Sequence, residues 1–220
     1  MNKRIEKLVQ KTLAGEMHVY PVKTDFDRCD LFLSPVKMSG KRVCEYIRNQ
    51  EPLIFTESCF TGLITFDGSV EGDIFHRNGH KNMSIACENF YNKPVDNLLT
   101  FEWQHSCGDF GKIINIGING IKDNIKKSAK THKGDADAIE FLKTQTDICD
   151  SILAWAKKCS KKAMAISKSV SDETYKRNLE RLSVSLENVP ENPASNFYEA
   201  ILSLGICFGL LPDSIGLIDR

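Results

Sequence analysis

The spacing of apolar residues divides this chain into a mixed first half and a helical second half. From about residue 111 onward, apolar side chains recur at three- and four-residue intervals, which is the period of an α-helix buried along one side. The longest such run predicts a single long helix, and its stripe is Ile139, Leu142, Cys149, Ile152, Ala156, Cys159, Ala163 and Ile166. We therefore expect residues 111–220 to be helical.

Two shorter helices are predicted after this long one. The first has the apolar stripe Tyr175, Leu179, Leu182, Leu186 and Val189. Asp172 and Glu173 stand at its start, where negative charge favours a helix N-terminus, and Pro190 ends it. The second is expected to start after Ser195 or Asn196, since either side chain could accept the hydrogen bond of an N-cap, and to continue through the apolar stretch that follows.

Residues 1–110 mix short helical and short strand patterns. One amphipathic helix is expected from Ile5, Leu8, Val9 and Leu13, and another from Val43, Tyr46 and Ile47. The apolar runs 53–56 and 63–66 have the length and the residue types of short strands. Taken together, the patterns predict a mainly α-helical protein with a few short strands, of the α+β class, in which residues 1–110 are mixed and residues 111–220 are helical.

Composition narrows the classes of function. The 220 residues include 29 basic and 29 acidic side chains, and zero formal net charge gives no general reason to expect nucleic acid or a membrane as a partner. The longest apolar stretch, 200–211, is about 12 residues long, whereas a membrane span needs about 20. The first residues carry no apolar segment of a secretory leader, and eight cysteines without a C-x-x-C pair indicate a cytoplasmic protein.

Two further features contain residue types that can form binding sites. His76 and His80 flank the turn-favouring pair Asn78–Gly79 and have no evident third ligand, so no metal site is predicted. Residues 111–170 hold twelve lysines against six acidic residues, and those that share one helical face are Lys157, Lys158, Lys161 and Lys162. We interpret this face as solvated rather than as a groove for phosphate, because arginine and interleaved aromatic residues are absent.

Residues 105–121 join a polar loop to an amphipathic helix. Asp109 stands where its carboxylate could cap that helix. The residues expected to pack inward are Ile113, Ile114, Ile118 and Ile121. Gly117 and Gly120 would each cost about 1 kcal/mol in an ordinary helix, which predicts a close approach of other backbone here. A histidine and an aspartate at a helix N-terminus, here His105 and Asp109, can also accept and deliver protons.

This segment resembles the H-T-x-P-D-Y-x-K-V-L-x-x-G-L-x-G-I signature of the pyruvate formate-lyase-like glycyl radical enzymes. Three further stretches resemble motifs of the same family in the same order: residues 138–158, residues 189–201 with V-P-x-x-P-A-x-x-F-x-E-A-L, and residues 212–220 with S-I-G-x-x-D-Q/R. The resemblance implies that residues 1–220 are an N-terminal fragment of the family's α/β barrel, which is wrapped by helices.

The chemistry of that family depends on two loops that have no counterpart in these 220 residues. The resemblance implies a radical on a backbone glycine, installed by a separate S-adenosylmethionine-dependent iron–sulfur activase, and a cysteine thiyl that draws a hydrogen from the substrate. No cysteine here lies in a G-C-V-E context, and residues 42–46 approximate the R-V-x-G-Y radical loop but carry Glu45 at the glycine position. We therefore expect this chain to bind no cofactor itself and to be inactive alone.

The resemblance assigns roles to two residues. His105 matches the histidine that contacts the substrate hydroxyl in dehydratase-type members and helps it leave as water, and Asp109 matches a motif aspartate near that pocket. Asp109 could instead be only a helix cap, and His105 could bind a loop carbonyl beside Trp103. Gly108 and Phe110 stand in place of the family's proline and tyrosine, which alters the setting of this loop.

The resemblance favours a dehydratase or C–X lyase over a formate acetyltransferase, because His105 suits a leaving hydroxyl. The expected partners are the remainder of the enzyme or a complementary subunit, the radical activase and a small-molecule substrate, and a homodimer is also allowed. The alternative is a non-catalytic helical binding or scaffold module that retains the family's framework.

Overall fold

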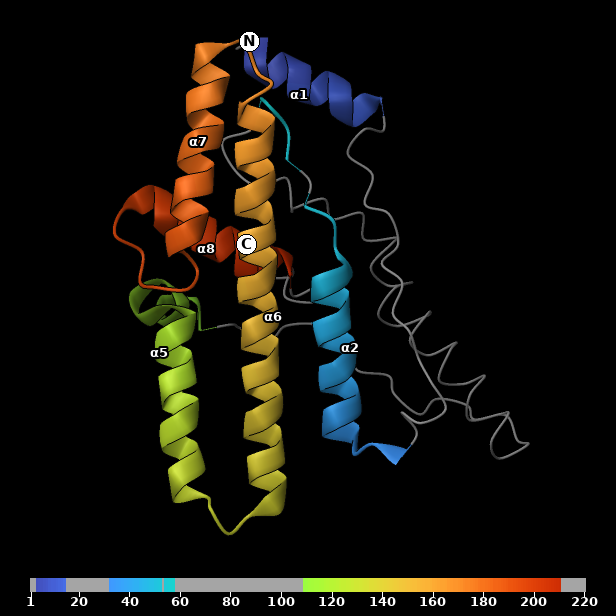
Figure 1. Cartoon of the computed structure of the whole chain (residues 1–220), viewed down its shortest axis with the longest axis vertical. Helices are drawn as coiled ribbons and strands as arrows, with labels where there is room; N and C mark the ends of the chain where they lie inside the picture. The colour runs from blue at the N-terminus through green and yellow to red at the C-terminus, as the bar shows by residue number, and fades with distance from the viewer. Residues whose placement is uncertain (1–2, 15–31, 53, 58–108, 211–220) are drawn as a thin grey trace, which may run out of the picture.

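The computed structural model describes residues 3–14, 32–52, 54–57 and 109–210 (Figure 1). Its helices are α1 (Lys3–Leu13), α2 (Pro35–Asn49), α5 (Phe110–Thr131), α6 (Ala136–Ser167), α7 (Glu173–Asn188) and α8 (Phe197–Gly209). These ranges contain no strand. The helical part of the predicted fold class is therefore confirmed, whereas the short strands find no support in the described part of the chain.

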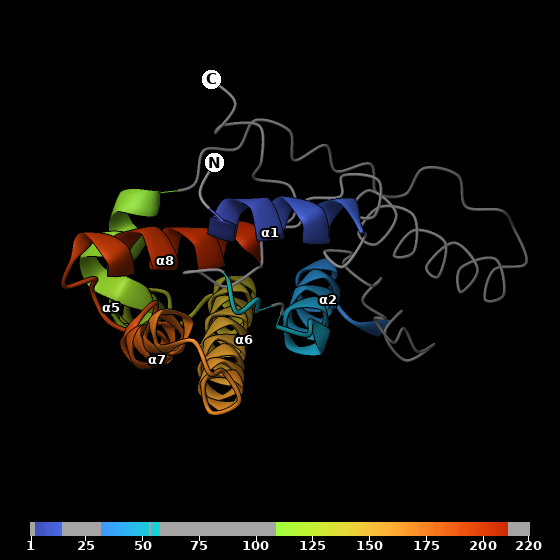
Figure 2. The ribbon, with the colours of Figure 1, turned by 90° about the horizontal axis from the view of Figure 1, so that it is seen from above.

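The long helix α6 is the axis of the arrangement. It has 32 residues and so spans about 48 Å, enough for different helices to pack along its two halves. α2 lies along one side of α6, and α7 and α5 lie along the other side at opposite ends (Figure 1). Seen from above, α7, α6 and α2 form one row, and α8 and α1 cross a face of that row (Figure 2).

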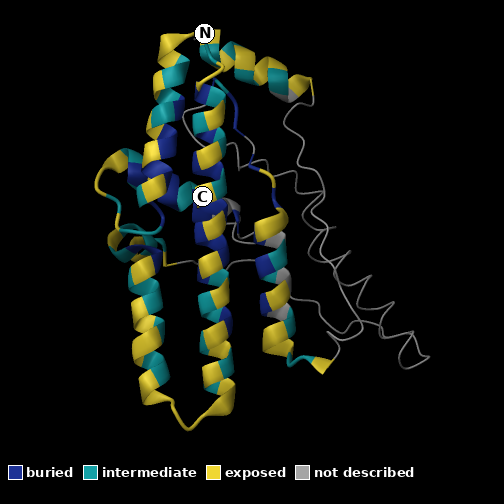
Figure 3. Cartoon of the chain, in the orientation of Figure 1, coloured by how far each residue is buried: buried dark blue, intermediate teal, exposed yellow. Residues whose placement is uncertain are grey.

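The hydrophobic core lies where α6, α7 and α8 meet, and buried positions concentrate there in Figure 3. Trp155 and Cys159 of α6 belong to the same buried cluster as Leu179 and Leu182 of α7 and Ile206 of α8. Burying one such leucine contributes about 1.5–3 kcal/mol to the free energy of folding, so this cluster fixes how the three helices pack.

The apolar stripe predicted for the long helix is correct over most of its length. Cys149, Ala156 and Ala163 are buried, as the helical period requires. Ile139 is 36% exposed, which differs from the prediction. The reason is geometric, since the first turns of α6 extend past α7 and α8 and, among the described helices, are flanked by α5 and α2 alone (Figure 1).

Capping side chains set where α6 and α7 begin. Asp135 accepts a hydrogen bond from the Ala138 amide at 3.0 Å, which caps α6. Asp172 accepts from the amides of Thr174 and Tyr175 at 2.8 and 3.1 Å, which caps α7. An aspartate at this position satisfies amides that the helix itself leaves without partners.

The N-cap of α8, for which the sequence allowed Ser195 or Asn196, is identified by a hydrogen bond. The Oδ1 atom of Asn196 accepts from the Glu199 amide at 3.1 Å, so Asn196, not Ser195, is the N-cap. α7 ends at Asn188, two residues before Pro190, as the proline predicts.

The strand predicted at residues 53–56 is wrong for its described part, residues 54–56. Ile54 and Phe55 are buried, but Thr56 and Glu57 form a turn and no ladder is present in the described residues. The apolar run is buried by side chains from helices instead of by strand pairing: Ile54 joins the core cluster, and the Lys11 ammonium lies 5.5 Å from the Phe55 ring centroid. The strand predicted at 63–66 lies outside the described residues.

Three lysines of the predicted basic face bind neighbouring segments of the protein. The Lys158 ammonium pairs with Glu51 at 2.6 Å, and that of Lys162 donates to the Pro52 carbonyl at 2.7 Å. Lys157 pairs with Glu191 at 3.2 Å. This face is therefore neither a plain solvated surface nor an open groove for phosphate. Its lysines bind the segment that follows α2 and the segment that follows α7 to α6.

α2 packs closely on α6 because position 40 has no side chain. A Cβ built on Gly40 would overlap the methyl group of Thr144. Residues 42–46, which resemble a radical loop in sequence, lie inside α2, and Cys44 is buried. Among the described helices, none combines the length and the apolar character that a membrane span requires.

Candidate functional site

Asp109 is the N-cap of α5. Its Oδ1 atom accepts the Lys112 amide hydrogen bond at 3.0 Å, and its Oδ2 atom lies 3.1 Å from the Lys112 ammonium. The backbone hydrogen bond from Lys112, aided by the Lys112 side chain, lowers the pKa of this carboxyl below its usual range. Asp109 is exposed and ionised at neutral pH, so its chemistry is that of a hydrogen-bond acceptor and not of an acid.

His105 lies outside the described residues, as do Trp103, Cys107 and Gly108. The cap that the sequence predicted for Asp109 is confirmed. The role of His105 and Asp109 toward a substrate stays a prediction.

The first turns of α5 are set apart from the rest of the helix by Gly117. This residue has φ +62° and ψ 179°, a conformation that only glycine adopts readily. The helical ladder breaks here: the Ile118 amide donates to the Pro190 carbonyl at 2.8 Å, where a continuous helix would direct it to Ile114. The Ile114 carbonyl instead accepts from the Ala194 amide at 3.0 Å.

The partner of this break is the α7–α8 loop, residues 189–196. In addition to the two bonds above, the Asn119 amide donates to the Glu191 carbonyl at 2.9 Å. A Cβ on Gly117 would lie 2.5 Å from the carbonyl carbon of Asn192. The close backbone approach predicted at Gly117 is therefore confirmed, and we call this contact the Gly117 junction.

Gly120 has a different explanation from the one predicted. A Cβ there would lie 2.6 Å from the Cβ of Ile116, a side chain of the same helix, and no other element is among its nearest contacts. Of the four isoleucines predicted to pack inward, Ile118 is buried in the core and Ile121 packs against it, whereas Ile113 and Ile114 are half-buried.

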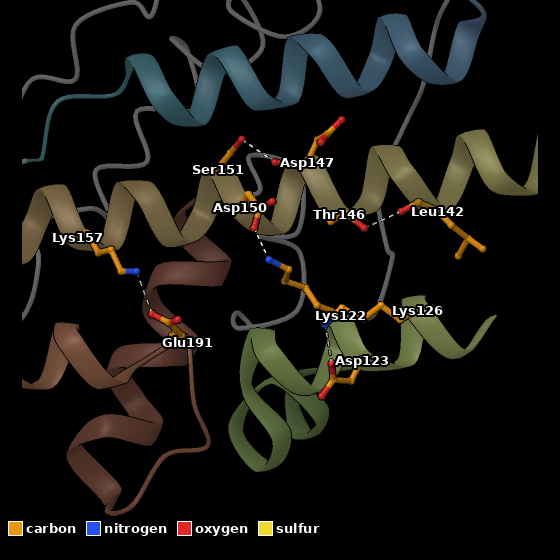
Figure 4. A network of polar contacts seen from close by, with 10 residues as sticks. All are labelled: Lys122, Asp123, Lys126, Leu142, Thr146, Asp147, Asp150, Ser151, Lys157 and Glu191. Atoms are coloured by element: carbon orange, nitrogen blue, oxygen red, sulfur yellow. Dashed lines mark hydrogen bonds and ion pairs between the residues drawn. The ribbon is translucent and has the colours of Figure 1, made fainter. Parts of the chain in front are cut away.

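Charged side chains connect the junction to α6 (Figure 4). Glu191 of the loop pairs with Lys157, and Lys122 of α5 pairs with Asp150 at 2.5 Å. The hydrogen bond to Asp150 raises the pKa of the Lys122 ammonium, despite an opposing effect of desolvation. The loop is thus joined to α5 by backbone hydrogen bonds and contacts α6 through a partly exposed ion pair.

The sequence alone did not identify Glu191 or Asn192 as partners of Gly117. The available signal was the pair Gly117 and Gly120 in residues 105–121, which predicted a close backbone contact without naming its partner. The structure brings residues 105–121 and residues 189–201 together at the Gly117 junction.

The described cysteines act as core side chains. Cys44, Cys149, Cys159 and Cys207 are all buried. Burial raises the pKa of the Cys149 thiol to about 11 and that of Cys207 to about 12, so neither is a ready thiolate nucleophile. Within the described ranges, no three His, Cys, Asp or Glu residues are grouped to hold a metal ion.

Comparison with known sequences identifies relatives over the second half of the chain. A family described as "Pyruvate formate lyase-like" matches residues 82–211, more than half of the chain. Isethionate sulfite-lyase of Nitratidesulfovibrio vulgaris is 34% identical over 107 residues, which are 46% of this chain and 13% of that protein. Indoleacetate decarboxylase of Tractidigestivibacter scatoligenes is 33% identical over 91 residues, 41% of this chain and 10% of that protein.

A solved structure supports the same relationship at the level of fold. The B12-independent glycerol dehydratase of Clostridium butyricum superposes with a TM-score of 0.66 and 16% identity, covering 86% of this chain and 31% of that one. This chain therefore spans a minor part of the length of its relatives. Because the family match includes both motifs that form the Gly117 junction, the chain belongs to the pyruvate formate lyase-like family of glycyl radical enzymes.

Proposed function

We propose that residues 1–220 form the N-terminal helical part of a glycyl radical lyase or dehydratase of this family. In this proposal, the glycine that carries the radical and the cysteine that forms the thiyl belong to polypeptide outside these residues. The family match over residues 82–211 carries the proposal, and the Gly117 junction lies inside that match, where a glycine at φ +62° is contacted by backbone of the α7–α8 loop.

The proposed substrate-facing groups are His105 and Asp109. Two properties of Asp109 support this role: it is exposed at the start of α5, and its lowered pKa keeps its carboxylate ionised. An exposed carboxylate can accept a hydrogen bond from a substrate hydroxyl. In the proposal His105 donates to the hydroxyl that leaves as water. The lyase and dehydratase names of the relatives favour this reaction class over acyl transfer.

A separate activase supplies the radical in this proposal. With S-adenosylmethionine and its iron–sulfur cluster, the activase abstracts the hydrogen atom whose loss creates the glycyl radical. The proposal assigns the cluster to the activase. This chain's own contribution is the framework around α5 and the two candidate substrate contacts.

The proposal is tested by identifying the endogenous polypeptide that contains these residues. An antibody against residues 136–188 captures the protein from an anaerobic lysate, and mass spectrometry measures the intact mass and sequences every bound chain. We expect the G-C-V-E and R-V-x-G-Y motifs either in the same polypeptide or in a stoichiometric partner. Capture of a polypeptide that carries neither motif, with no such partner, would contradict the proposal and favour the scaffold alternative.

The substrate roles are tested in the complete, activated enzyme. Asp109→Asn keeps the size and the capping oxygen but removes the charge, and His105→Gln removes the proton donor. We expect each to lower kcat/KM at least about tenfold, the loss of one hydrogen bond to a charged group. Lys126→Gln, on the exposed face of α5, is the control and should retain full activity.

A further inference from the structure

The α7–α8 loop has an anchor that the Gly117 junction does not itself contain, the carboxylate of Glu199. Its Oε2 atom accepts hydrogen bonds from the Asn188 side-chain amide at 2.9 Å, the Ser195 backbone amide at 2.9 Å and the Ser195 hydroxyl at 2.6 Å. Asn188 ends α7 and Ser195 lies near the end of the loop. One oxygen therefore joins the two ends of the loop.

Glu199 is a charged group in a buried position. It is 8% exposed, and burial acts to raise its pKa, but the hydrogen bonds from Ser195 and Asn188 outweigh burial and lower that pKa. The carboxylate is therefore ionised, and its three hydrogen bonds are charge-assisted, which makes them stronger than neutral ones. Its own amide donates to Asn196, which fixes the carboxylate relative to the first turn of α8.

Two other polar side-chain contacts of the loop are longer or more exposed. The Asn119 side chain donates to that of Asn192 at 3.2 Å on the surface. The ion pair of Lys157 with Glu191 includes a lysine side chain that is 58% exposed, and such pairs contribute little to stability in water. Glu199 is the buried charge among these anchors.

The loop in turn is hydrogen-bonded to both parts of α5. Because the ladder of α5 breaks at Gly117, the turns before it are linked to the protein by the Ala194 bond to Ile114, and the turns after it by the bonds of Ile118 and Asn119 to the loop. A change in the shape of the loop therefore changes the angle between the two parts of α5. Asp109 caps the first part and moves with it.

We propose that Glu199 is a positioning residue, which sets the orientation of the turn that carries Asp109 by holding the α7–α8 loop in the shape that fits Gly117. This inference rests on the proposed function only where it treats Asp109 as a substrate contact. The mechanical link from Glu199 to Asp109 is a property of the chain itself and is tested without activity.

Hydrogen exchange measured by NMR tests the link on the full chain. Glu199→Gln keeps the side-chain shape but removes the charge. We expect exchange of the Ile118, Asn119 and Ala194 amides to accelerate roughly tenfold, while amides in the α6–α7 core, such as that of Leu182, keep their wild-type rates. Glu187→Gln, an exposed carboxylate on α7, is the matched control and should change none of these rates.

A fluorine label at Phe110 reports the orientation of the first turn directly. Trifluoromethyl-phenylalanine at this position should give one ¹⁹F resonance in the wild type, and a shifted or second resonance in Glu199→Gln under conditions in which circular dichroism shows the variant to be fully folded. A purely stabilising role would leave the resonance in place. If Glu199→Gln fails to fold, Ser195→Ala removes one donor at an exposed residue and should produce a smaller change of the same kind.

Unchanged junction amides and an unchanged ¹⁹F resonance in a folded variant would overturn the proposal. Acceleration of junction and core amides by the same factor would also overturn it, because it would show only global destabilisation. A response at the junction, combined with a failure to find the radical motifs in the endogenous protein, would support the positioning role of Glu199 and reject the proposed enzymatic function.

Discussion

The amide of Ile118 donates its hydrogen bond across 2.8 Å to the carbonyl of Pro190, outside its own helix. This bond exists because Gly117 turns the backbone out of the helical path at φ +62°. The two residues lie in separate sequence motifs, and their contact is the point at which α5 and the α7–α8 loop fix each other.

Gly117→Ala should destabilise the protein by about 3 kcal/mol or more, because alanine is strained at this φ and ψ and its Cβ would meet the backbone of Asn192. Urea unfolding of the full chain, followed by circular dichroism, measures the change. Gly134→Ala is the control, since a Cβ at position 134 meets nothing within 4 Å, and it should shift the free energy of unfolding by less than about 0.5 kcal/mol. Equal effects of the two substitutions would contradict the account of the junction.

Gly40→Ala should separate α2 from α6 and cost about 1–3 kcal/mol through overpacking against the Thr144 methyl group. Thr144→Ser removes that methyl group and keeps the hydroxyl that bonds to the Glu140 carbonyl at 3.0 Å. The double variant should therefore regain most of the loss. A double-mutant cycle with no coupling between the two positions would show that this contact does not control the packing of α2.

The stability contributed by Glu199 should depend on pH. Burial raises its pKa, but the Ser195 and Asn188 hydrogen bonds dominate and place the folded-state pKa below the ordinary value of 4.5. The contribution is therefore complete above about pH 4.5 and is lost as the pH falls through the folded-state pKa. Urea unfolding of the wild type and of Glu199→Gln between about pH 6 and about pH 3 should show a difference that shrinks toward acid. A difference independent of pH would mean that the charge of Glu199 is irrelevant.

The buried thiols should react slowly with alkylating reagents while the protein is folded. Burial raises the pKa of Cys149 to about 11, that of Cys207 to about 12 and that of Cys159 further still. At about pH 8 the thiolate fraction of each is lowered roughly 100-fold or more from that of an unperturbed cysteine, before steric protection is counted. Peptide mass spectrometry after timed iodoacetamide treatment, with and without urea, measures each rate. Labelling of Cys159 at equal rates in the two conditions would contradict its place in the core.

The sequence predicted the helices well, because an apolar stripe or a capping residue acts locally. Asp135 and Asp172 cap α6 and α7, and the period of apolar residues correctly places Cys149 and Ala163 in the core. Ile54 was predicted wrongly, since a short apolar run has the same composition in a strand as in a segment buried under helices. Periodicity carries no information about which neighbour buries the run.

The candidate site was predicted only in part. Two glycines indicated a close contact, but nothing in the local pattern distinguished Gly117, which meets the Asn192 backbone, from Gly120, which meets Ile116 of its own helix. The partners of Lys157 and Lys158 were hidden for a similar reason, because Glu191 and Glu51 come from distant segments. Contacts between distant segments depend on the tertiary fold, which a local pattern does not encode.

The central claim is that this chain contributes framework and substrate contacts to a glycyl radical enzyme while the radical is held by other polypeptide. Electron paramagnetic resonance tests it most directly, after anaerobic incubation with the activase, S-adenosylmethionine and a reductant. We predict no glycyl radical doublet from residues 1–220 alone, and a doublet when the polypeptide carrying the R-V-x-G-Y motif is present. A clear doublet from residues 1–220 alone would contradict the account.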